Sequence, residues 1–101
     1  LEIGQAAYAE TGYPFEWQNH HQGGVVGYEP REYIATPGGA DILAAGQALA
    51  WNPTVAGAKM EDTILLGEDE NIILTPTTDW PLEEVKLPGL TPVLCPLVWV
   101  R

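Results

Sequence analysis

Glycine and proline interrupt this chain at short intervals, and these interruptions limit it to one short helix and a series of short strands. In residues 1–11 apolar side chains recur near helical spacing, and Gly12 suits the left-handed backbone that ends a helix. Pro14 then prevents the helix from continuing. The apolar runs that follow are too short for further helices, so the pattern predicts an α+β fold.

Several apolar segments predict strands. They are residues 23–28, 47–51, 60–66 and 72–75. Residues 60–66 form a nearly continuous apolar run, which is typical of a strand covered on both faces. Residues 36–39 and 67–71 predict turns, whereas residues 41–45 are too short for a helix and end at Gly46.

The two ends of the chain differ from this middle part. Prolines make residues 82–101 a proline-rich tail, in which residues 93–100 form an edge strand at best. No Ser, Thr, Asp or Asn precedes the first apolar residues to cap the helix, so we expect that Leu1 is not a natural domain start. We therefore interpret residues 1–101 as a single segment whose partner is a missing amino-terminal half of the same domain.

The charge and cysteine content exclude several classes of site and partner. The chain has 14 acidic and 4 basic residues, a formal net charge of −10, and no basic patch for a nucleic acid. No apolar run approaches the roughly 18 residues that a membrane span needs, so we expect no membrane partner and a cytoplasmic location. Cys95 is the only cysteine, which excludes an internal disulfide and a cysteine-based zinc site, and its apolar neighbours predict a buried, inert thiol.

Histidines, glycines and charged side chains concentrate in residues 20–32, at a density typical of a binding site. A second stretch, residues 58–66, carries a carboxylate pair into an apolar run, and Asn52 lies between the two stretches. A carboxylate in so apolar a run needs a partner. A salt bridge between Glu61 and Arg31 therefore fits the pattern as well as a ligand-binding role does.

These stretches, in this order, resemble the carboxy-terminal half of the pita-bread metallopeptidase superfamily, which includes aminopeptidase P, prolidase, methionine aminopeptidase and creatinase. His20 falls on the first His of the family pattern, and Pro53 falls on the Pro of its Glu-Pro-Gly segment. Residues 57–63 match its Arg-Ile-Glu-Asp segment. The resemblance covers residues 12–81 and implies the carboxy-terminal half of a pita-bread fold, a curved and mostly antiparallel sheet with a helix on one face.

Three positions depart from the family pattern. Gly24 stands at the metal-binding His, Arg31 at the second catalytic His, and Asn52 at the metal-bridging Glu. A glycine supplies no donor atom, an asparagine carries no charge, and an arginine repels cations. Only Glu61 keeps a ligand-type side chain, so Glu61 is expected to bind a metal only if one is retained.

The resemblance therefore implies an Xaa-Pro peptidase-like protein with an eroded metal site and no cofactor. Such a protein is a metal-free hydrolase, or a homologue that binds a small molecule or peptide or has a regulatory role. The residues assigned to this site are His20, His21 and Arg31 for catalysis, and Glu61, Asn52 and Gly24 for ligand binding. The histidine pair fits equally well a role in which it bonds only to backbone groups.

Two alternatives remain open at this point. One is an active metal-dependent Xaa-Pro aminopeptidase or dipeptidase that holds Mn, Co or Zn. The other is a structural or dimerisation segment without its own activity. Half of such a sheet would expose an apolar face and a strand edge, so we expect either the missing half or a homodimer to cover them.

Overall fold

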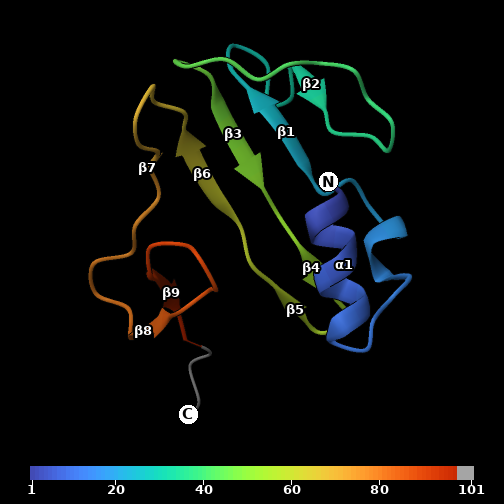
Figure 1. Cartoon of the computed structure of the whole chain (residues 1–101), viewed down its shortest axis with the longest axis vertical. Coiled ribbons are helices and arrows are strands. Elements are labelled where there is room, and N and C mark those ends of the chain that lie inside the picture. Colours follow the sequence, from blue (N-terminus) through green and yellow to red (C-terminus); the bar gives the residue numbers. More distant parts are fainter. Residues whose placement is uncertain (98–101) are drawn as a thin grey trace.

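The computed structural model describes residues 1–97 and consists of one α-helix, a five-stranded sheet and two small hairpins (Figure 1). The elements, in chain order, are α1 (Glu2–Glu10), the 3₁₀-helix η1 (Glu16–Gln18), β1 (Gly23–Val26), β2 (Tyr33–Ile34), β3 (Ala48–Trp51), β4 (Thr54–Val55), β5 (Ala58–Lys59), β6 (Asp62–Leu65), β7 (Ile72–Ile73), β8 (Leu82–Val85) and β9 (Val93–Pro96). The fold class is α+β with antiparallel pairing throughout these elements, as predicted. The specific pita-bread arrangement stays a prediction.

The helix α1 ends where the sequence predicts. Thr11 is its C-cap, and Gly12 follows with φ of 91°, a left-handed conformation that glycine adopts without strain. Leu1 occupies the N-cap position and makes no capping side-chain hydrogen bond. Only Tyr8 of this helix is buried, so its contact with the rest of the molecule depends largely on one side chain.

The main sheet has the strand order β2-β1-β3-β6-β7. The predicted strands correspond to β1, β3, β6 and β7, although β6 begins at Asp62, after Met60 and Glu61. Residues of β6 are half-buried, so the expectation that this strand is covered on both faces is wrong for residues 1–97. The edge strand β2 was not predicted, because two paired residues leave no periodic pattern in a sequence.

The strands β3 and β6 are the two arms of one long hairpin, with β4 and β5 at its tip (Figure 1). Trp51 pairs with Asp62, and Thr54 pairs with Lys59, in one continuous register. A hydrogen bond of 3.1 Å from the Met60 N–H to the Pro53 carbonyl oxygen joins the two parts. Gly57 takes a φ of 89° at the turn, which allows a tight reversal.

Two adjacent glycines allow β1 to lie close to both of its neighbours. A Cβ atom on Gly24 would collide with the carbonyl oxygen of Tyr33 on β2, and one on Gly23 would collide with the Ala50 carbonyl on β3. Gly23 also has a positive φ of 147°. The sequence predicts a close approach at this point, and the backbone of the chain itself makes that approach.

The segment after Trp80 differs from the proline-rich tail that the sequence predicts. Residues 82–85 form β8, which pairs with β9, and the Trp80 indole N–H donates a hydrogen bond of 2.6 Å to the Leu97 carbonyl oxygen. Prolines do not prevent this hairpin, because they lie at its turn and at its last paired residue. Cys95 is half-buried instead of buried. The predicted strand beyond residue 97 lies outside the described residues.

Few apolar side chains are buried within residues 1–97. Tyr8 and Ala50 are buried, whereas Ile3 is 88% exposed and Ile72 is 53% exposed. Large apolar side chains are therefore exposed on α1 and on the edge strand β7, and the missing half and the homodimer stay predictions. In the described part of the chain, the one α-helix is too short to cross a membrane.

Candidate ligand site

Glu61 lies between two cations just before β6. Its Oε2 atom is 2.7 Å from the Lys59 ammonium, and its Oε1 atom is 3.3 Å from a terminal nitrogen of Arg31. The hydrogen bond from Lys59 is the largest influence on this carboxyl and lowers its pKa, and Arg31 adds to the effect, while partial desolvation opposes it. The salt bridge with Arg31 that the sequence suggested is therefore present.

The contact between Arg31 and Glu61 spans the sheet. Arg31 precedes β2 and Glu61 precedes β6, and both β1 and β3 lie between those two strands in the sheet order. A second terminal nitrogen of Arg31 donates a hydrogen bond of 2.6 Å to the Pro30 carbonyl oxygen. The side chain is only 21% exposed, so its charge is held near the sheet and not in open solvent.

Asn52 stands beside this ion pair, at the end of β3. Trp51 pairs with Asp62 and Pro53 is bonded to Met60, so the same register places Asn52 opposite Glu61. On its other side, the Asn52 backbone N–H donates a hydrogen bond of 2.8 Å to the Gln22 carbonyl oxygen. Asn52 is only 6% exposed, and therefore its side chain needs partners inside the protein or from a ligand.

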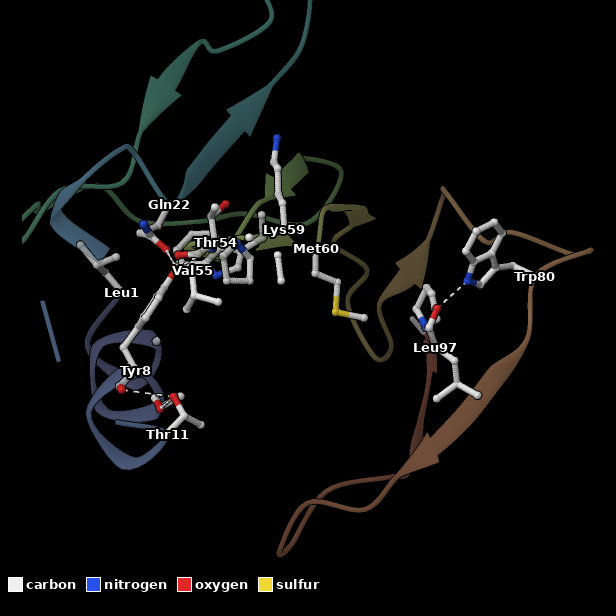
Figure 2. A pocket seen from close by; sticks show the side chains of 17 residues that line it. Leu1, Tyr8, Thr11, Gln22, Thr54, Val55, Lys59, Met60, Trp80 and Leu97 are labelled. Atoms are coloured by element: carbon white, nitrogen blue, oxygen red, sulfur yellow. Dashed lines mark hydrogen bonds between the residues drawn. The ribbon is translucent and has the colours of Figure 1, made fainter. Parts of the chain in front are cut away.

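Gln22 and Tyr8 form the buried support of this site (Figure 2). The Tyr8 hydroxyl accepts a hydrogen bond of 2.6 Å from the Thr54 N–H, and its proton faces the Gln22 Oε1 atom and the Thr54 carbonyl oxygen, each at 2.9 Å. The Gln22 amide nitrogen donates to the carbonyl oxygens of Trp17 and His20. These bonds hold α1 and the segment before β1 against the hairpin tip.

The two histidines occupy different environments. The Nδ1 atom of His20 is 2.6 Å from the carbonyl oxygen of His21, and the two rings lie edge to face at 6.3 Å. An Nδ1 atom that faces a carbonyl oxygen carries the proton, so the neutral ring has its lone pair on Nε2. His21 is exposed, whereas His20 is half-buried. Of the pair, His20 is thus the better placed to act on a ligand.

Three buried side-chain atoms in residues 1–97 have no hydrogen-bond partner. They are His20 Nε2, Arg31 Nε and Asn52 Oδ1. All three belong to residues that the sequence assigned to the site. Two of the atoms, His20 Nε2 and Asn52 Oδ1, are acceptors, and Arg31 Nε is a donor. Buried polar atoms without partners are rare in proteins, so each of the three indicates a position where a water molecule or a polar ligand atom would bond.

Gly24 is the one predicted ligand-binding residue whose surroundings are filled by the chain. The space beside its Cα atom is occupied by the backbone of Tyr33 and Ile34 on β2. The sequence did not single out Tyr8 and Gln22, although both are buried and hydrogen-bonded. A tyrosine in a short helix and a glutamine beside two histidines carry no motif that would have identified them.

Within the described part of the chain, no three side chains of the His, Cys, Asp or Glu type lie close enough to hold a metal ion together. Comparison of the chain with protein-family models, curated proteins and solved structures found no match. The resemblance to the pita-bread peptidases therefore stays a prediction from the motifs alone.

Proposed function

We propose that this chain binds a small polar molecule at the end of the five-stranded sheet, between His20, Asn52 and the Arg31–Glu61 ion pair. The observation that supports the proposal is the set of three buried, unpartnered atoms on His20, Arg31 and Asn52. A bound molecule that bonds to these atoms would remove the cost of leaving them unpaired, which is about 1–3 kcal/mol for each group.

The unpartnered atoms define the chemistry of the ligand. Arg31 offers an N–H donor with a positive charge, which favours a carboxylate oxygen. Asn52 Oδ1 and His20 Nε2 offer acceptors, which favour an amine, a guanidinium or a hydroxyl group. The ligand class is therefore a small molecule that carries a carboxylate together with an N–H or O–H donor.

Catalysis on such a ligand would depend on His20. Its unpartnered Nε2 lone pair would take a proton from an attacking water, which is the role of a general base in a metal-free hydrolysis. We propose that the function is binding of the small polar ligand, and that hydrolysis of this ligand is a second, dependent activity. The metal-dependent peptidase stays a prediction, which metal analysis of the purified protein can test.

The test is isothermal titration calorimetry with a panel of amino acids, hydroxy acids and guanidino acids. We expect saturable binding of at least one compound. The variant Arg31→Lys keeps the positive charge but lacks the Nε–H donor, so its affinity is expected to fall by about tenfold or more. Asn52→Ala is expected to weaken binding similarly. Lys86→Ala, which removes a cation from the distant C-terminal hairpin, is the control and should bind as the original chain does.

Two results would contradict the proposal. One is the absence of saturable binding across the panel. The other is equal affinity in the original chain, in Arg31→Lys and in Asn52→Ala, because the unpartnered atoms would then have no part in the contact. Circular dichroism of each variant shows whether the sheet is retained.

A further inference from the structure

A cleft of about 780 Å³ lies between α1, the tip of the long hairpin and the C-terminal hairpin (Figure 2). Its lining is mainly apolar and includes Trp51 and Met60 from the long hairpin, Trp80 and Leu97 from the C-terminal hairpin, and Ala7 from α1. The volume falls within the range of about 300–1,000 Å³ that small-molecule sites in proteins occupy.

The polar side chains that line this cleft are largely engaged with the protein itself. Tyr8, Gln22 and Thr54 bond to one another or to nearby backbone groups. Thr11 donates a hydrogen bond to the Ala7 carbonyl oxygen. The cleft therefore offers few free hydrogen-bonding groups to a ligand.

The one charged side chain of the lining is also neutralised. The Lys59 ammonium lies 2.7 Å from Glu61, and in Figure 2 it points away from Met60 and Leu97. Its alkyl stem, and not its charge, faces the cleft. A charged or strongly polar ligand would lose its hydration against this mainly apolar lining, whereas an apolar ligand has little hydration to lose.

We propose that the cleft binds an uncharged, apolar small molecule, held by contact with Trp51 and Met60. The Trp51 indole provides a large apolar face that suits an aromatic or polycyclic compound. A second copy of the chain is a poorer occupant, since each copy carries a formal net charge of −10 and the two would repel.

This site is separate from the polar site at the end of the sheet. None of His20, Arg31, Asn52 and Glu61 lines the cleft. Tyr8 and Gln22 line the cleft and also support the polar site, but the side chains that would contact the two ligands differ, and so does the ligand chemistry. A failure of one therefore leaves the other unaffected.

The test uses Nile red, an uncharged apolar dye, with its fluorescence followed in the presence of the 101-residue chain. We expect saturable binding of one dye per chain and quenching of tryptophan fluorescence. The anionic dye ANS should bind at least tenfold more weakly, because its sulfonate group would lose hydration against a mainly apolar lining.

A cleft-blocking variant locates the bound dye. Ala58 lines the cleft and is exposed on β5, so Ala58→Trp places an indole in the cleft without disturbing a buried position. We expect this variant to weaken Nile red binding at least tenfold. Ala40→Trp adds the same ring at an exposed loop position away from the lining and should bind the dye as the original chain does.

Three results would overturn the proposal. The first is non-saturable Nile red fluorescence, which indicates adsorption to scattered apolar groups. The second is equal binding by Ala58→Trp and Ala40→Trp, which places the dye outside the cleft. The third is tighter binding of ANS than of Nile red, which contradicts an uncharged ligand.

Discussion

Glu61 shows how the neighbours of one residue set its response to pH. The ammonium of Lys59 and the guanidinium of Arg31 both contact this carboxylate and lower its pKa. A carboxyl with a lowered pKa in the folded state stabilises the fold above the ordinary pKa of the unfolded chain, and this contribution disappears as the pH falls through the folded value. The side chain is 40% exposed, so the contribution is small, about 0.2–1 kcal/mol at most.

We predict that Lys59→Gln raises the pKa of Glu61 toward the ordinary glutamate value, because it removes the cation that lowers this pKa most. Arg31 remains in the variant, so a smaller depression persists. Carbon-detected NMR of the glutamate carboxyl groups, titrated from acid to neutral pH, measures the change. Lys86→Gln is the control, and an unchanged Glu61 pKa in Lys59→Gln would show that the ion pair does not form in solution.

Gly24 is a position where a single methyl group decides the packing of a strand pair. Its added Cβ would meet the backbone of Tyr33, which cannot move away as a flexible side chain can. We predict that Gly24→Ala destabilises the protein by about 1–3 kcal/mol. Gly4→Ala is the control, since nothing lies within 4 Å of an added Cβ in α1, and it should stabilise by roughly 0.5–1 kcal/mol. Urea unfolding distinguishes the two; equal stabilities would contradict the strand contact.

At the scale of elements, the helix depends on one hydroxyl group for its attachment. Tyr8 is the only buried residue of α1, and its hydroxyl bonds to Thr54 on β4 and to Gln22 before β1. We predict that Tyr8→Phe costs about 1–3 kcal/mol, because the Thr54 N–H loses its partner in a part-buried position. Tyr13→Phe is the control, because Tyr13 is 46% exposed.

Hydrogen exchange locates the effect of the Tyr8 substitution. We expect faster exchange of the α1 amides in Tyr8→Phe, with exchange in β3 and β6 less affected. Exchange in α1 that matches that of the original chain would mean that the helix is attached by contacts other than this hydroxyl.

The sequence predicted the elements that carry a strong local signal. The end of α1 at Gly12 and the arms of the long hairpin follow from glycine conformation and apolar runs. The strand β8 was missed, because prolines argued for an irregular tail, whereas β9 lies within the edge strand allowed at residues 93–100. Among site residues, the Arg31–Glu61 contact was anticipated from charge alone, whereas the role of Tyr8 depends on contacts far apart in the sequence.

At the scale of the whole molecule, the chain combines an exposed edge strand with a large negative net charge. The strand β7 lies at the edge of the main sheet, and Ile72 and Leu74 are 53% and 50% exposed. Unpaired edges with apolar side chains favour association with another strand, while repulsion between chains of formal net charge −10 opposes it. The extent of association should therefore depend on the salt concentration.

We predict that the chain forms dimers more readily at high salt than at low salt, because the Debye length falls from about 30 Å at 0.01 M to about 3 Å at 1 M. Light scattering coupled to size-exclusion chromatography measures the mass. Ile72→Lys should reduce the dimer, whereas Ile3→Lys makes the same charge change on an exposed helix position away from the edge. A mass that does not respond to salt or to Ile72→Lys would exclude association through β7.

The continuous register of the long hairpin has a consequence for the order of folding. Its turn at Gly57 joins residues that are close in sequence, so it forms on the timescale of isolated hairpins, about 1–10 μs, before any strand distant in sequence is recruited. The arm β3 then offers a preformed edge to β1, and this step must close the long loop that contains β2. Closure of β1 onto β3 is therefore expected to limit the folding rate, and the helix α1 attaches only after it.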